Sequence, residues 1–201
     1  MDLKKRLHRA LTSTAREFNR SLDRFDPTIG DKTYPERMVS YYFIRAVAKA
    51  LPPANVLLEL PVIGKRKHIQ DNHIDALVFN DRELVLAEFK RGWAPGHWES
   101  LYRDFERLKG SNVAKEIRRG FRNDQHRRAY IFLCADCWYL EKAKAWKSGK
   151  PLGAKWSLPK PMLAAHRDYL TVYSEIGKDY DGYYFTWALI PLDKMPAQQI
   201  A

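Results

Sequence analysis

Two short apolar segments joined by a polar turn constrain the fold of this chain more than any other feature. They cover residues 73–79 and 84–90, are rich in β-forming side chains, and flank a turn-like stretch at Asn80–Glu83. This pattern predicts a β-hairpin. The second segment is apolar on both faces, with Leu86 on one and Phe89 on the other. Such a strand belongs in a sheet that is covered on both sides, so we expect an α/β fold with helices on both faces.

The register of this hairpin brings three ionisable residues together. If the turn is centred between Asp81 and Arg82, Asp75 lies opposite Glu88, with Cβ atoms about 5 Å apart. Lys90 projects from the same face as Glu88, because strand side chains alternate. Two carboxylates at that distance repel each other, and a divalent cation between them allows both to ionise. The pattern predicts a metal site beside an ammonium group, and a solvated salt-bridge cluster is the alternative.

Charge and composition narrow the classes of partner. The net charge of +11 and the pI near 9.6 favour a polyanion, with nucleic acid first and an acidic membrane surface second. Solubility alone is the other explanation of this charge.

No apolar run reaches transmembrane length, so we expect no membrane span. Cys134 and Cys137 lie in an apolar segment and are predicted to be buried thiols rather than zinc ligands, which suits a reducing cytoplasm.

Periodicity gives the expected order of elements along the chain. Helical spacing of apolar residues predicts helices, and short apolar runs between turn signals predict strands. The expected helices cover residues 2–24, about 35–51, about 98–108, about 112–119 (short and basic) and about 138–147. The expected strands cover 56–63, the two halves of the hairpin, 129–138, 169–176 and 183–192.

The acid, then acid-x-lysine, pattern resembles the signature of the PD-(D/E)XK nuclease superfamily. It reads Ile74-Asp75 followed by Glu88-Phe89-Lys90, with Ile74 in place of the motif's proline. The family's helix–strand–strand–strand–helix–strand core also matches the expected order over residues 33–138. The resemblance implies a restriction endonuclease-like mixed central sheet in a single nuclease-like domain, 1–201. Its parts are an N-terminal helical extension (1–30), a catalytic core (33–138) and a C-terminal elaboration (139–201).

The resemblance also implies a chemistry, which is metal-dependent hydrolysis of phosphodiester bonds, with DNA favoured over RNA. Asp75, Glu88 and the Phe89 carbonyl would hold Mg²⁺, or Mn²⁺ in its place. Lys90 would orient the attacking water or stabilise developing charge. Glu36, at the start of the preceding helix, would reach the metal; first-turn dipole stabilisation is its other explanation. The helix after Lys90 lacks the glutamine of exonuclease-like members, which argues against that subgroup.

Basic residues near the motif are the candidates for nucleic-acid binding, because phosphate contacts supply affinity without sequence information. Trp93 and Trp98 are candidates for base stacking or for packing. Cleavage of both strands of a duplex would favour a homodimer. The alternative function is a non-catalytic module that binds nucleic acid or protein on a nuclease fold. The basic candidates are Lys65, Arg66, Lys67, Arg91, Arg118, Arg119 and Arg122.

Overall fold

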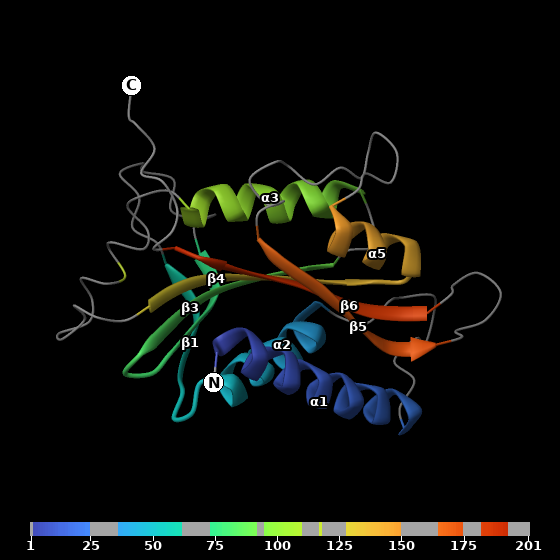
Figure 1. Cartoon of the computed structure of the whole chain (residues 1–201), viewed down its shortest axis with the longest axis horizontal. Coiled ribbons are helices and arrows are strands. Elements are labelled where there is room, and N and C mark those ends of the chain that lie inside the picture. Colours follow the sequence, from blue (N-terminus) through green and yellow to red (C-terminus); the bar gives the residue numbers. More distant parts are fainter. Residues whose placement is uncertain are drawn as a thin grey trace.

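The computed structural model describes residues 2–24, 36–61, 73–91, 95–109, 117, 128–149, 165–174 and 182–192. Within these ranges the protein is a mixed α/β structure (Figure 1). The helices are α1 (Leu3–Arg24), α2 (Glu36–Ala50), α3 (Pro95–Lys109) and α5 (Leu140–Ser148). The strands are β1 (Asn55–Pro61), β2 (His73–Phe79), β3 (Glu83–Arg91), β4 (Arg128–Cys137), β5 (His166–Ser174) and β6 (Gly182–Pro191).

The strands form one six-stranded sheet in the order β1-β2-β3-β4-β6-β5. The β3–β4 pair is parallel and the other four pairs are antiparallel, so the sheet is mixed. The expected helices and strands within the described ranges are present, with ends that shift by a few residues, whereas the short helix expected at about 112–119 lies outside these ranges except for residue 117. The largest shifts, of three residues, are at the start of α3, expected at 98 and found at Pro95, and at the start of β5, expected over 169–176 and found at His166–Ser174. Strand β5 shows the reason. Its first residues are polar and pair with β6, so the apolar pattern did not mark its start.

Helices cover both faces of the sheet, as the apolar pattern predicted. Figure 1 shows α1 and α2 on one face and α3 and α5 on the other. The alternation along β3 explains this arrangement. Val85 and Phe89 belong to the buried cluster that includes α1 and α2, whereas Leu84 and Leu86 belong to the cluster with α3. Each helix therefore buries its apolar stripe against one side of the same strands.

The hairpin has the predicted register. Ala76 pairs with Ala87, and Phe79 pairs with Leu84, which centres the turn between residues 81 and 82. The Asn80 side chain closes this turn, because its Oδ1 accepts hydrogen bonds of 2.9 Å from the backbone N–H groups of residues 82 and 83. A polar side chain that binds its own turn is the usual reason for asparagine at such a position.

The sheet is irregular beside Asp75. Strand β1 pairs with β2 on either side of this position, but Glu59, which would face it, has φ of 49° and leaves the ladder. Ile74 and Leu77 both belong to the cluster with α3, although residues three apart on a regular strand face opposite sides. The backbone therefore changes its alternation near Asp75, although the pairing register of β1 with β2 is the same on both sides of this position.

Two further expectations concern membrane-spanning helices and the two cysteines. None of the helices in the described ranges is long and apolar enough to cross a membrane. Cys134 and Cys137 are buried free thiols, as predicted.

Candidate active site

Asp75 and Glu88 come together where β2 and β3 separate. The hairpin register, continued by one residue beyond the Ala76–Ala87 pair, places them opposite each other. Asp75 bonds the neighbouring strand directly, because its Oδ2 accepts a hydrogen bond of 2.7 Å from the backbone N–H of Phe89. Its side chain is half-buried, whereas Glu88 is only 1% exposed. The two carboxylates therefore face one small region at the edge of the core.

The surroundings of Glu88 disfavour its ionised form. Burial, and after it the neighbouring Asp75 carboxylate, raise the pKa of Glu88 to about 9. Arg107 acts in the opposite direction but does not restore the ordinary value. A cation placed between the two acids would lower the pKa of Glu88 again, because it would favour the ionised form.

Helix α3 supplies a basic partner for Glu88. One guanidinium nitrogen of Arg107, Nη2, donates to Glu88 Oε1 at 2.5 Å, and Nη1 donates to the backbone carbonyl of His73 at 2.6 Å. The same Nη2 lies 3.2 Å from Asp104 Oδ1. Arg107 therefore links α3 to both strands of the hairpin, and it fixes the side chain of Glu88 through a charge-assisted hydrogen bond.

Lys90 has a partner on the same helix. Its Nζ lies 3.0 Å from Asp104 Oδ2. Burial lowers the pKa of Lys90, but the Asp104 carboxylate outweighs burial, and the net shift is upward. Lys90 is therefore a fixed ammonium group at neutral pH, suited to stabilise negative charge and unsuited to accept a proton.

The sequence pattern missed both α3 residues, although it contained a signal for them. Leu101, Phe105 and Leu108 form the buried stripe of α3. Asp104 and Arg107 lie beside this stripe in a helical projection, so a charged pair at the border of the core was foreseeable. Their contact with Glu88 and Lys90 was not, because it depends on how α3 crosses the sheet.

The remaining predicted residues divide into described and undescribed positions. The Phe89 ring is buried and stacks on Phe43 of α2 at a centroid distance of 5.9 Å. Glu36 is the first residue of α2, but its side chain lies outside the described ones, as do those of Arg91 and Trp98. Residues outside the described ranges altogether are Lys65, Arg66, Lys67, Trp93, Arg118, Arg119 and Arg122.

The oxygen ligands that the described residues offer are of the type that a hard divalent cation prefers. Asp75 and Glu88 offer carboxylate oxygens, and the raised pKa of Glu88 marks the need for positive charge. The described residues contain no group of three or more His, Cys, Asp or Glu side chains that could hold a metal ion. Further ligands would have to come from water, substrate, the Phe89 carbonyl or Glu36. The Cys134 thiol is fully buried, and burial together with Asp75 holds its pKa well above the usual value, so it is not a ligand.

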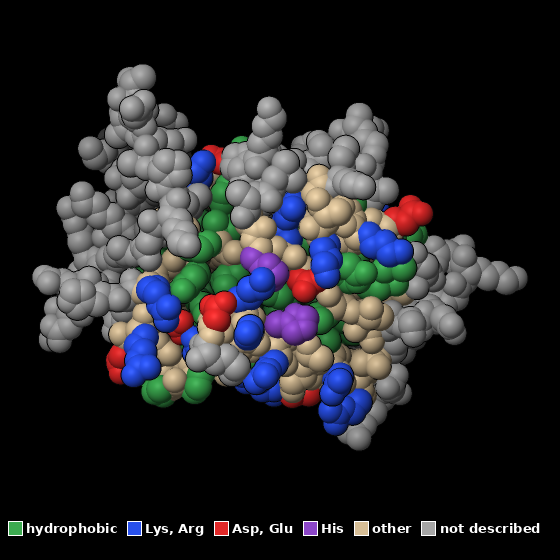
Figure 2. All heavy atoms as spheres, in the orientation of Figure 1, with side chains coloured by type: hydrophobic (Ala, Val, Ile, Leu, Met, Phe, Trp, Pro, Cys, Tyr) green, Lys and Arg blue, Asp and Glu red, His purple; other side chains and the backbone are tan. Residues whose placement is uncertain are grey.

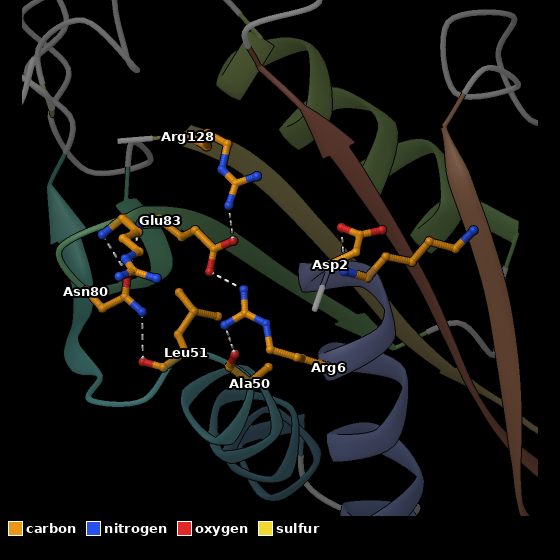
Figure 3. A network of polar contacts seen from close by, with 9 residues as sticks. Asp2, Arg6, Ala50, Leu51, Asn80, Glu83 and Arg128 are labelled. Atoms are coloured by element: carbon orange, nitrogen blue, oxygen red, sulfur yellow. Dashed lines mark hydrogen bonds and ion pairs between the residues drawn. The ribbon is translucent and has the colours of Figure 1, made fainter. Parts of the chain in front are cut away.

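A second polar network lies at the opposite end of β3. The buried Glu83 accepts hydrogen bonds from Arg6 of α1 and, at 3.2 Å, from Arg128 of β4. Figure 3 shows these two arginines approaching the carboxylate from different elements. Arg6 also donates to the Ala50 carbonyl at 2.8 Å. An open pocket of about 550 Å³ beside this network is lined by Arg6, Pro52, Pro53, Asn80, Asp81, Arg82, Glu83 and Arg128.

Two observations assign this second network to structure rather than to the candidate active site. None of the predicted catalytic residues lines the pocket. Both carboxylate oxygens of Glu83 already bind arginines that belong to the fold. The network therefore attaches α1 and the end of α2 to the hairpin.

No protein-family model, no curated protein and no solved structure matches this chain. Its function is therefore inferred from the residues and their geometry.

Proposed function

We propose that this protein is a metal-dependent nuclease that hydrolyses phosphodiester bonds, with DNA as the favoured substrate. The observation that carries the proposal is the meeting of Asp75 and Glu88 at the separation of β2 and β3, with Lys90 on the same face as Glu88. Two acids followed by a lysine at this point are the set that the PD-(D/E)XK resemblance calls for. The mixed sheet and the covering helices are compatible with a restriction endonuclease-like arrangement, which belongs to the same proposal.

Each residue has a role that follows from its surroundings. Asp75 and Glu88, with the Phe89 carbonyl and Glu36, would hold Mg²⁺ or Mn²⁺. A bound divalent ion supplies a more acidic water and polarises the phosphate. Lys90, held by Asp104, presents a permanent positive charge to the phosphate oxygens as negative charge develops on them. The net charge of +11 would attract a polyanion to the protein.

A second function is favoured by one specific observation. Glu88 and Lys90 already have partners on α3, namely Arg107 and Asp104. A nuclease fold that does not catalyse a reaction would also contain ion pairs of this kind. The second candidate is therefore a module that only binds nucleic acid or protein. The free thiols bear on neither function, and they suit the reducing cytoplasm that we propose for the chain.

DNA cleavage tests the proposal. Purified protein is incubated with supercoiled plasmid and with linear DNA, in Mg²⁺, Mn²⁺ or EDTA. Asp75→Asn and Lys90→Met are compared with Asp81→Asn and Lys144→Met, which make the same changes at exposed positions on the hairpin turn and on α5. We expect metal-dependent cutting that falls by about 100-fold or more in the first two variants, since each removes a charge that acts on the transition state.

The other outcomes have definite meanings. Cutting that survives both Asp75→Asn and Lys90→Met would contradict the site. Salt-sensitive DNA binding by the unchanged protein with no cutting in either metal would favour the binding module, because phosphate contacts release counterions.

A further inference from the structure

Helix α2 carries a stripe of basic and aromatic residues on the side that faces away from the sheet. Arg37, Tyr41, Arg45 and Lys49 follow one another at intervals of four, so they line one side of the helix. Tyr41 is 55% exposed, which makes it the most exposed phenylalanine, tyrosine or tryptophan among the described residues. Neither the proposed catalytic set nor the packing of the sheet uses this stripe.

The ring of Tyr41 is held in place while its surface remains open. The guanidinium carbon of Arg45 lies 5.4 Å from the centroid of the Tyr41 ring. Tyr42 contacts the same ring edge-on, at a centroid distance of 5.5 Å. The Tyr42 hydroxyl in turn lies 2.8 Å from Ser21 Oγ of α1. An exposed aromatic ring with a fixed orientation is suited to stacking, because less side-chain entropy is lost when a flat ligand binds.

The charges around the ring favour a polyanion. Glu17 of α1 pairs with Lys49 at 2.6 Å and with Arg45 at 3.1 Å. Arg37 and Arg20, which is one turn beyond Glu17 on α1, are exposed. Among the described side chains along this α1–α2 surface, Glu17 is the acid set against these cations. Figure 2 shows Lys and Arg side chains along the lower part of the molecule, where α1 lies, with scattered Asp and Glu side chains between them.

The stripe lies on a helix that packs against the strand of the candidate active site from the face of the sheet opposite to the Glu88 and Lys90 side chains. Phe43, two residues after Tyr41, stacks on Phe89, whose N–H binds Asp75. Two residues correspond to about 200° around a helix, so Tyr41 points outward where Phe43 points to the sheet. Glu88 and Lys90 point to the other face, toward Arg107 and Asp104 of α3, so α2 and the sheet lie between the stripe and these two side chains.

We propose that the stripe formed by Arg37, Tyr41 and Arg45, with Arg20, binds single-stranded nucleic acid. This inference rests on the proposed function and adds the substrate class, a single strand or the single-stranded flank of a duplex. The ring stacks on an unpaired base and the arginines contact the phosphates on either side. A duplex hides the faces of its bases in the stack, and an acidic peptide has no need of the ring.

Binding without cleavage tests the inference. Fluorescence anisotropy of a labelled 20-nucleotide oligothymidylate, and of a duplex of the same length, is measured with the full chain in EDTA. We expect tighter binding of the single strand, and a rise in Kd of about tenfold in Tyr41→Ala with little change in Tyr41→Phe, which keeps the ring. Arg37→Gln should weaken binding and reduce the salt slope by about 0.7, the value for one phosphate contact on a single strand.

Tyr139→Ala is the matched control. Tyr139 is also partly exposed and also lies beside a cation, with Lys142 Nζ at 4.4 Å from the ring centroid, but it precedes α5 on the other face of the sheet. It should bind as the unchanged protein does. Equal binding by Tyr41→Ala and the unchanged protein would overturn the inference. Displacement of the oligonucleotide by polyglutamate, with loss of binding in Arg37→Gln but not in Tyr41→Ala, would overturn it in favour of an acidic protein partner.

The two proposals fail separately. Metal-dependent cutting of DNA together with unchanged binding by Tyr41→Ala would remove only the stripe. Ring-dependent binding of a single strand by a protein that cuts nothing would remove only the nuclease.

Discussion

Glu88 is the residue whose environment is hardest to explain by folding alone. It is almost fully buried, its neighbour across the hairpin is another acid, and its pKa is raised to about 9. A buried acid with too little positive charge around it reduces stability when it ionises. Active sites often keep groups of this kind, and strongly shifted pKa values mark candidate sites for that reason.

Glu88→Gln should stabilise the protein, and more so at higher pH. The native state holds a proton on Glu88 that the unfolded chain loses above its ordinary pKa near 4.5, so this group's contribution to stability falls as pH rises from about 4.5 to about 9. Glutamine keeps an acceptor for Arg107 without the charge. We expect a gain of about 1 to 3 kcal/mol at pH 8.5 and a smaller gain at pH 5.5, measured by denaturant unfolding. Glu141→Gln, at an exposed position of α5, is the control. Loss of stability at pH 8.5 would show that Glu88 is a structural ion-pair partner.

Arg107→Met should have the opposite effect. It removes the hydrogen bonds to Glu88 and to the His73 carbonyl, and it leaves a buried acid beside Asp75 with less compensation. The free energy of unfolding should fall by about 1 to 3 kcal/mol, with the larger fall at alkaline pH, where Glu88 must ionise. Arg103→Met changes an exposed arginine on the same helix and should alter stability little. Equal effects of the two substitutions would mean that Arg107 contributes only surface charge.

At the scale of elements, the attachment of α1 depends on polar contacts as well as on its apolar stripe. Arg6 binds the Glu83 side chain of β3 and the Ala50 carbonyl at the end of α2 (Figure 3). Its neighbour Leu7 is buried in the cluster shared with the sheet. The contacts fix the position of α1 along the sheet, and with it the position of the surface that α1 shares with α2.

Arg6→Ala should therefore destabilise the protein by about 1 to 3 kcal/mol, because it leaves the buried Glu83 with Arg128 alone. Lys5→Ala, a change at the exposed neighbouring position, should cost much less. Urea unfolding of both variants measures the difference. A fall that is equal in the two would show that the network contributes nothing to the attachment of α1.

The elements show which parts of this structure the sequence could predict. The β2–β3 register followed from alternating side chains and from a turn that Asn80 closes with its own side chain. The α3 partners of Glu88 and Lys90 did not follow, because helix crossing angles depend on packing between distant residues. The irregularity at Asp75 and Glu59 also had no local signal, since glutamate rarely takes a positive φ.

At the scale of the whole molecule, the sequence analysis predicted the α/β class and the covering of both faces, but it did not predict the strand order. Strand β6 lies between β4 and β5, although β5 precedes it in the chain. A signal for this existed. Strand β6 reads as a nearly continuous apolar run and is buried, whereas β5 begins with His166-Arg167-Asp168 and lies at the edge. The cluster of Asp75, Glu88 and Lys90 was predictable from the hairpin, and its connection to α3 and α2 required the assembled fold.

The central claim is that Asp75 and Glu88 together bind a divalent cation. Binding of Mn²⁺ tests this claim most directly. Electron paramagnetic resonance measures the concentration of free Mn²⁺ as protein is added, at a pH below the raised pKa of Glu88. Calorimetry of the same titration in two buffers measures the release of protons. The account predicts saturable binding that releases a proton from Glu88 and weakens at least tenfold in both Asp75→Asn and Glu88→Gln, with Asp81→Asn unchanged. Equal binding by all four proteins, or none by the unchanged one, would contradict it.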